Sequence, residues 1–143
     1  GIVMASIGGF QLGSVGEPPF NYETASEEDR NAFLQSEADA FGKVVKRGLI
    51  SPSGVGPSMR LGDTLVNERR KQITYIIQVN GQIASGQQFS KARDQFLQKV
   101  CPRFMKTNAA KNEVSLVQEF RNTKNKYSMG KITLSTDICS RFV

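Results

Sequence analysis

The sequence contains no histidine and no tryptophan, and it has two cysteines in 143 residues. Histidine is the commonest general base and the commonest neutral metal ligand, so its absence argues against histidine-dependent catalysis and against a zinc site. The sequence also lacks a G-x-S-x-G motif and a phosphate-binding Gly-Lys-Ser/Thr motif. We therefore expect a protein that is not an enzyme and that uses no cofactor and no metal.

No apolar stretch is long enough to cross a membrane, and the length favours one domain. Residues 1–25 contain several glycines and the pair Pro18–Pro19, without helical or strand periodicity. We expect this segment to be an extended N-terminal arm that Phe10, Phe20 and Tyr22 attach to the body. Residues 26–143 are then expected to form a single α+β domain.

Charge is distributed unevenly along the chain, which has a net charge of +6. Residues 1–58 contain four basic and seven acidic residues, whereas the remainder contains 15 basic and six acidic residues. This pattern indicates either an anionic partner or an ordinary lysine-rich surface. The densest cations fall in two expected hairpin loops, and they form the candidate partner-binding set: Arg69, Arg70, Lys71, Lys124 and Lys126.

Two segments have the periodicity of amphipathic helices. Ser26 is a good N-cap, acidic residues follow it, and Gly48 is a natural end, so the first helix is expected over residues 26–48. The second helix begins after Ser85–Gly86. A proline disfavours helical backbone geometry at the residue before it, so Pro102 predicts that this helix ends near Val100 or Cys101. Residues 106–112 are expected to be a polar connector.

Four segments alternate between apolar and polar residues like half-buried strands. They cover residues 59–67, 72–79, 113–121 and 127–138. Short polar segments join them as two hairpins, which gives the order helix, hairpin, helix, hairpin. This order predicts an α+β fold, with a mostly antiparallel sheet of about four strands and two helices packed on one face.

Cys101 and Cys139 follow the second helix and the last expected strand, and they allow one disulfide or none. A bond between them would close a loop of 38 residue steps. The chain-entropy model assigns such a loop about 4 kcal/mol of stabilisation. Disulfides persist in oxidising compartments, so a bond favours a periplasmic or secreted protein. The alternative is a pair of buried free thiols in a cytosolic protein.

A basic sheet is also compatible with single-stranded nucleic acid as a ligand. Tyr75, Phe120 and Tyr127 lie on expected strands, where aromatic rings can stack on bases, and cationic loops flank them. No RNP-like motif accompanies these rings, so a protein partner is favoured over nucleic acid. A small secreted virulence or inhibitor protein is a further alternative.

The segment Phe96-Leu97-x-x-x-Cys101-Pro102, followed by a polar hairpin and Thr136-Asp137-Ile138-Cys139, resembles in its layout the small lipoprotein pilotins of type II secretion. The resemblance covers residues 65–143. It implies a periplasmic α+β domain that binds the C-terminal segment of a secretin subunit. Pilotins begin with a lipid-modified cysteine, and none precedes Ser26 here, so peripheral membrane association would require an N-terminal anchor that this sequence lacks.

These observations together predict an exported, non-enzymatic binding module, such as an accessory or assembly factor of a cell-envelope secretion system. We expect it to capture a helix or a strand of a partner protein in an apolar groove or at a sheet edge. The basic loops would steer an acidic partner toward that site.

Overall fold

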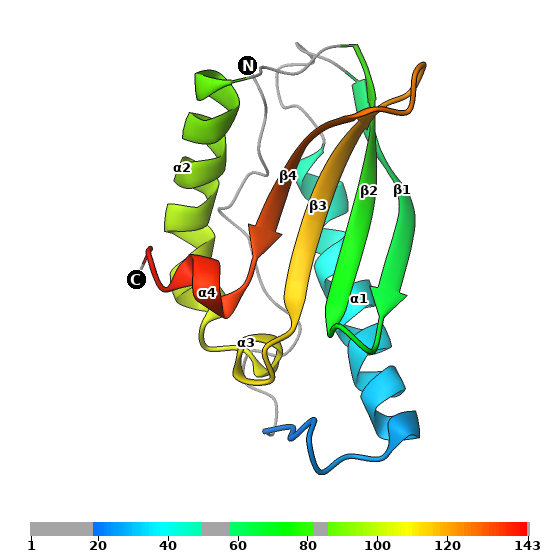
Figure 1. The fold of residues 1–143 in the computed structure, drawn as a ribbon, viewed down its shortest axis with the longest axis vertical. Helices are drawn as coiled ribbons and strands as arrows, with labels where there is room; N and C mark the ends of the chain where they lie inside the picture. The colour runs from blue at the N-terminus through cyan, green and yellow to red at the C-terminus, as the bar shows by residue number, and fades with distance from the viewer. Residues whose placement is uncertain (1–18, 50–57, 82–85, 143) are drawn as a thin grey trace.

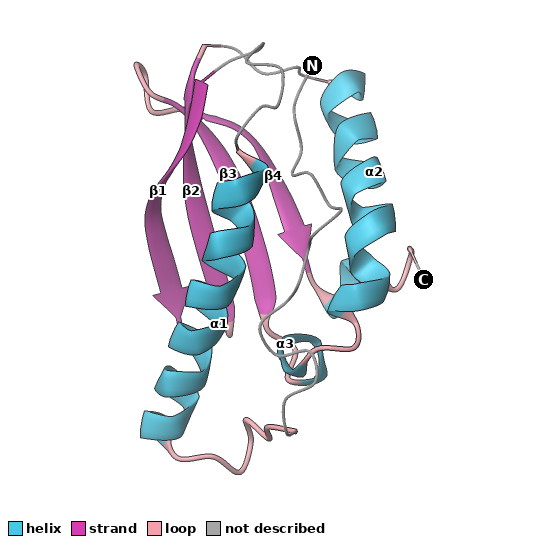
Figure 2. Cartoon of the chain, turned by 180° about the vertical axis from the view of Figure 1, so that it is seen from behind, coloured by secondary structure: helices cyan, strands magenta, loops and turns pink. Residues whose placement is uncertain are grey.

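The computed structural model describes residues 19–49, 58–81 and 86–142. Along the chain its elements are α1 (Glu27–Gly48), β1 (Ser58–Asn67), β2 (Gln72–Asn80), α2 (Gln87–Phe104), α3 (Asn108–Lys111), β3 (Ser115–Asn122), β4 (Ser128–Leu134) and α4 (Thr136–Cys139). The strands form one sheet of four, and α1 and α2 pack on the same side of it (Figure 1, Figure 2). The predicted α+β fold is therefore confirmed.

The sheet has the strand order β1-β2-β3-β4. β1 pairs with β2, and β3 pairs with β4, as two antiparallel hairpins. The central strands β2 and β3 are parallel, with Gln72 opposite Ser115 and Val79 opposite Asn122. Parallel neighbours need a long crossover connection, and the segment that contains α2 and α3 supplies it. The sheet is thus mostly antiparallel, as predicted, with one parallel pair joining the two hairpins.

Helix α1 shows how local sequence fixes an element. The Ser26 hydroxyl oxygen accepts a hydrogen bond from the Asp29 amide at 3.1 Å, and three acidic residues occupy the first turn. Both features stabilise a helix N-terminus. The buried stripe includes Leu34 and Phe41, and the Phe41 ring lies 5.3 Å from the Tyr75 ring on β2. The expected helix is confirmed, and it covers the β1–β2 half of the sheet (Figure 2).

The expected end of the second helix near Val100 or Cys101 is wrong, because α2 continues through Pro102 to Phe104. A proline removes one backbone N–H, and near a helix end that loss is small compared with the burial gained beyond it. Phe104 is fully buried, and the Met105 amide closes the last turn by donating to the Cys101 carbonyl at 3.0 Å. Burial of Phe104 therefore outweighs the local preference of the proline.

Two expectations near the C-terminus also need correction. The last strand ends at Leu134 rather than at Ile138, and Thr136–Cys139 form the short helix α4. The spacing from Leu134 to Ile138 fits a helix as well as a strand, which explains the error. The expected polar connector at residues 106–112 contains α3, which Thr107 caps by accepting a hydrogen bond from the Ala110 amide.

Cys101 and Cys139 form a disulfide with their Cα atoms 5.1 Å apart, and both residues are fully buried. The bond joins the end of α2 to α4, not to a strand as the sequence had indicated. It therefore attaches the crossover helix to the segment that follows the last strand.

Tyr75 illustrates how the core accommodates a polar atom. Its ring is fully buried beneath α1, and its hydroxyl donates a hydrogen bond to the Ala38 carbonyl at 2.6 Å. Burial raises the pKa of the Tyr75 phenol far above its usual value, and the nearby Asp39 and Glu37 carboxylates add to this effect. The folded protein therefore keeps Tyr75 protonated at alkaline pH.

Removing the disulfide should lower the free energy of unfolding substantially. For the double substitution Cys101→Ser and Cys139→Ser, we expect a loss of about 4 kcal/mol, because the unfolded chain regains the entropy of the open loop. Urea denaturation followed by circular dichroism measures this loss. Reductant should destabilise the wild-type protein and leave the double variant unchanged; an equal response of both proteins would contradict the expectation.

Replacing Tyr75 with phenylalanine should give a stability loss that shrinks at alkaline pH. At pH 7 we expect a loss of about 1 kcal/mol, from the missing hydrogen bond to Ala38. Because the pKa of Tyr75 is raised in the folded state, the wild-type stability contribution of the phenol is present below pH about 10 and is lost as pH rises further, when the unfolded chain ionises. The variant lacks this group, so the two stabilities should converge. A gap that stays constant in denaturation curves at pH 7 and above pH about 10 would contradict this account.

Candidate functional site

The described residues enclose two hollows of substantial size. The first, called the junction pocket here, has a volume of about 530 Å³ and is lined by Pro19, Phe20, Asn21, Tyr22, Glu23, Lys71, Lys111, Asn112 and Glu113. The second, called the β4 groove, has a volume of about 440 Å³ and is lined by Arg93, Asp94, Leu97, Lys131, Thr133, Ile138, Arg141 and Phe142.

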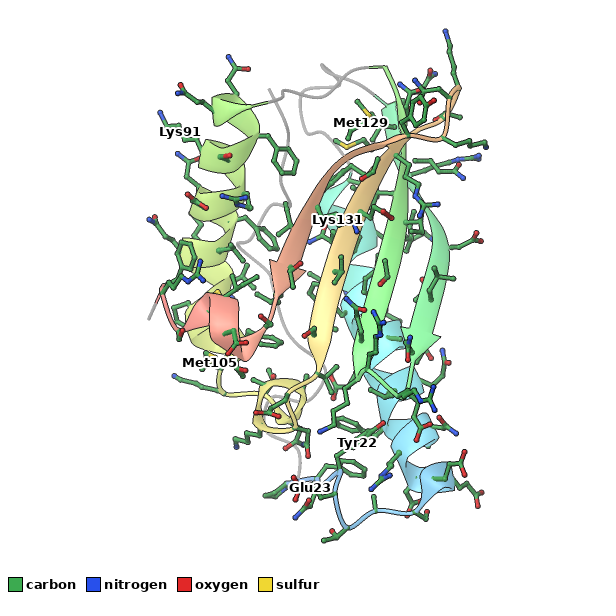
Figure 3. All side chains as sticks on the ribbon, in the orientation of Figure 1. Tyr22, Glu23, Lys91, Met105, Met129 and Lys131 are labelled. Carbon is green, nitrogen blue, oxygen red and sulfur yellow. A yellow bond between two sulfur atoms is a disulfide. The ribbon has the colours of Figure 1, made fainter. Side chains whose placement is uncertain are left out.

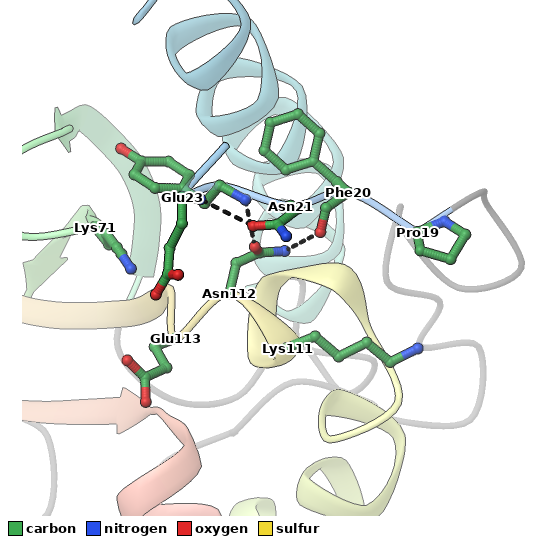
Figure 4. A pocket seen from close by; sticks show the side chains of 9 residues that line it. Pro19, Phe20, Asn21, Glu23, Lys71, Lys111, Asn112 and Glu113 are labelled. Atoms are coloured by element: carbon green, nitrogen blue, oxygen red, sulfur yellow. Dashed lines mark hydrogen bonds between the residues drawn. The ribbon is translucent and has the colours of Figure 1, made fainter. Parts of the chain in front are cut away.

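The junction pocket is built around Asn112, which follows α3 (Figure 4). Its side-chain oxygen accepts a hydrogen bond from the Tyr22 amide at 2.8 Å. Its side-chain nitrogen donates to the Phe20 carbonyl at 2.9 Å and to the Asn108 carbonyl at 2.8 Å. The chain itself thus occupies both donor positions of the Asn112 amide and one of the two acceptor positions of its oxygen. The hydrogen bonds of Asn112 therefore attach residues 20–22 to the body.

Tyr22 completes this attachment. The Arg30 guanidinium lies 5.0 Å from the centre of its ring and the Lys71 ammonium 4.9 Å from it, while its hydroxyl donates to the Glu68 carbonyl at 3.0 Å. Burial raises the pKa of the Tyr22 phenol, Glu68 raises it further, and Arg30 opposes them. Tyr22 belongs to the hydrophobic core and Phe20 packs against it, as expected of the arm; Phe10 lies outside the described residues.

The β4 groove lies beside the outer edge of the sheet. β4 is the last strand of the sheet and pairs with β3 on one side. On its other side lies α2, and α4 follows β4 at one end (Figure 1). Among the described residues, the backbone hydrogen bonds formed outside helices and strands include none to residues 128–134. Within the described part of the chain, the outward backbone groups of β4 therefore have no backbone partner, and such groups can pair with another strand.

The groove has an excess of positive charge. Arg93 pairs with the neighbouring Asp94 at 3.2 Å. The Lys131 ammonium lies 3.8 Å from Glu119, but Arg121 holds that carboxylate more closely, at 2.8 Å. Lys131 is 61% exposed and lies on the sheet face opposite α1 (Figure 3).

Arg141 adds a further cation to the groove. It is exposed, and in the part of the chain that the structure describes no carboxylate forms an ion pair with it. Leu97, Ile138 and Phe142 supply apolar surface between the cations. Apolar surface bordered by a few placed charges is the usual composition of a binding site.

The structure does not bring the candidate partner-binding cations of the sequence together. Arg69, Arg70 and Lys71 lie in the turn between β1 and β2, whereas Lys124 and Lys126 lie in the turn between β3 and β4. Because β2 and β3 are parallel, these turns are at opposite ends of the sheet (Figure 1). Lys71 is half-buried against Tyr22, and the other four are exposed. A role for them in partner binding stays a prediction.

The aromatic residues considered for base stacking are not arranged for it. Tyr75 is fully buried, and Phe120 is 2% exposed in the core. Tyr127 is 74% exposed, but it lies in the loop before β4 and not on a strand. Tyr75 and Phe120 are therefore core residues and are not exposed for stacking on bases.

The cations of the β4 groove were not among the candidates, because they come from distant segments. Arg93 is on α2, Lys131 is on β4, and Arg141 follows α4. The sequence relates only two pairs of groove residues. Arg93 and Leu97 share a helix face at a spacing of four, and Lys131 and Thr133 share a sheet face at a spacing of two. The crossover that places α2 beside β4 is not visible in either spacing.

Comparison with known proteins assigns no family to the chain. No protein family, curated protein or solved structure matches it. Among the described residues, none of the helices combines the length and apolarity needed to cross a membrane. The same residues contain no group of three or more Cys, Asp or Glu residues able to hold a metal ion. The geometry of the β4 groove is therefore the basis from which a function is inferred.

Replacing Asn112 with alanine should destabilise the attachment of residues 20–22. The Tyr22 amide and the Phe20 carbonyl both lose their partner, so we expect a loss of about 2 kcal/mol in the free energy of unfolding. Urea denaturation measures this loss. Gln88→Ala, an exposed position on α2, is the control and should change stability by less than about 0.5 kcal/mol. Similar losses for the two variants would rule out a role of Asn112 in attaching residues 20–22 to the body.

Proposed function

We propose that this protein is an exported, non-enzymatic binding module that captures a segment of a partner protein in the β4 groove. One observation carries the proposal: apolar surface and an excess of cations lie directly beside a sheet edge whose backbone has no partner among the described residues. Sheet edges of this kind bind protein segments by continuing the sheet or by receiving them in an adjacent groove.

Export is supported by the buried disulfide between Cys101 and Cys139. Such bonds are stable in the periplasm or outside the cell and rare in a reducing cytosol. The bond joins two elements that border the groove, α2 and α4. Oxidation would therefore hold two walls of the binding site in place, and the proposed site and the proposed compartment depend on each other.

The partner that we propose is a component of a cell-envelope secretion system. The basis is the layout that the chain shares with type II pilotins, in which two cysteines flank a hairpin. The excess of positive charge in the groove is consistent with electrostatic steering of an acidic segment. Nothing in this proposal requires catalysis, a cofactor or a metal.

Site-specific photo-crosslinking in the native cells tests the proposal. A photoreactive residue in place of Thr133, inside the groove, should give one dominant adduct with an envelope protein. The same residue in place of Gln35, which is exposed on α1 at a distance from the groove, is the control and should not give that adduct. Equal adducts from both positions, or none from Thr133, would contradict the proposed site.

The proposed compartment is checked in the same cells. Lysis in the presence of a thiol-alkylating reagent should leave both cysteines unmodified, because the disulfide is already formed. Reduction before alkylation should modify both. Modification of the two thiols without reduction would contradict export while leaving the crosslinking result to decide on the groove.

A further inference from the structure

We propose that the β4 groove takes an extended, acidic segment of the partner protein, which adds to the outer edge of β4 as a fifth strand. This inference rests on the proposed function, and it specifies the conformation and the charge of the bound segment. Three features of the molecule support it: the backbone of β4, the charges around the groove, and the alternation of side chains along the strand.

The backbone of β4 is better suited to strand addition than that of the opposite edge, β1. In β1 the pairing register shifts between Leu61 and Thr64, and irregularities of this kind protect sheet edges from pairing with other chains. In β4 the register shift lies near its beginning, and residues 130–134 pair with β3 without interruption. No other described residue pairs with the outer side of this regular stretch, so it can accept a further strand.

The charges of the groove select an acidic segment. Lys131 extends from β4 itself, whereas Arg93 and Arg141 approach from α2 and from the residues after α4. Asp94 is the one carboxylate in the lining, and Arg93 pairs with it. Lys131 is exposed and only 3.8 Å from Glu119, which Arg121 holds more closely, and Arg141 has no ion-pair partner among the described residues. A bound carboxylate would therefore meet Arg141 and the exposed Lys131, while a bound lysine or arginine would be repelled by both.

The alternation of side chains along a strand predicts the pattern of the bound segment. Lys131 and Thr133 point to the sheet face opposite α1, so alternate residues of an added strand lie beside them. The intervening residues point to the helix side, where Leu97 of α2 borders the groove. The fitting segment alternates acidic residues with apolar ones, and it binds with its backbone extended.

Peptide binding to the full chain tests this inference. The probe is a labelled, end-blocked heptapeptide of alternating valine and glutamate, and the matched peptide carries lysine in place of glutamate. Fluorescence anisotropy should give a Kd of about 1 mM or tighter for the glutamate peptide. We expect binding of the lysine peptide to be weaker by a factor of about ten or more.

A charge-reversal variant localises the binding. Arg141→Glu should weaken binding of the glutamate peptide by a factor of about five. Lys43→Glu makes the same change of charge on an exposed position of α1, away from the groove, and should leave the affinity within a factor of about two. Equal effects of the two substitutions would show that net charge, and not the groove, determines binding.

Amide hydrogen exchange by NMR tests the strand geometry. Saturating glutamate peptide should protect alternate backbone amides within residues 130–134, namely those that do not already bond to β3. Protection without this alternation, or equal binding of the two peptides, would overturn the inference. Binding of an oligonucleotide at the same amides with higher affinity than the glutamate peptide would also overturn it.

The result also separates this inference from the proposed function. If the Thr133 crosslink captures an envelope protein at a helical or basic segment, the binding function stands and the acidic-strand inference falls. If the glutamate peptide binds with the expected alternation but the crosslink in cells captures no envelope protein, the chemistry of the groove stands and the proposed cellular role falls.

Discussion

The parallel pairing of β2 with β3 is the constraint on which the rest of the structure depends. Two hairpins joined in this way need a connection that returns to the starting end of the sheet, so the chain between them must cross over through α2 and α3. In this protein the crossover places α2 beside β4, the second strand of the later hairpin. The space between α2 and β4 becomes the β4 groove. The candidate site is thus a product of the topology of the sheet.

The close approach of α2 to β4 requires a residue without a side chain at position 130 of β4, which is glycine. A side chain on Gly130 would bring its Cβ atom within 2.6 Å of the Phe89 ring, which packs against the strand from the first turns of α2. The same ring meets Phe120 of β3 edge-on, with the ring centres 6.1 Å apart. Glycine on the strand and phenylalanine on the helix together set the width of the gap at one end. The disulfide and α4 set it at the other end.

Most of the fold follows from local signals in the sequence, and the site does not. Ser26 and Gly48 mark the limits of α1. They can be recognised from the sequence because the backbone groups at a helix end, which lack partners within the helix, are satisfied by neighbouring residues. The extension of α2 past Pro102 was missed because it depends on the burial of Phe104, a tertiary effect. The groove was missed for the same reason. Its cations come from segments that lie side by side only because the parallel pairing of β2 and β3 requires a crossover, and no spacing along the chain encodes that pairing.

The covalent link divides the molecule into two parts of different character. Residues 101–139 form a closed ring that contains β3 and β4, whereas α1 and the first hairpin lie outside it and are held by backbone pairing and packing. Local opening of a protein follows its least constrained units. Loss of the pairing between β2 and β3 would therefore leave β4, α4 and the end of α2 joined by the covalent link.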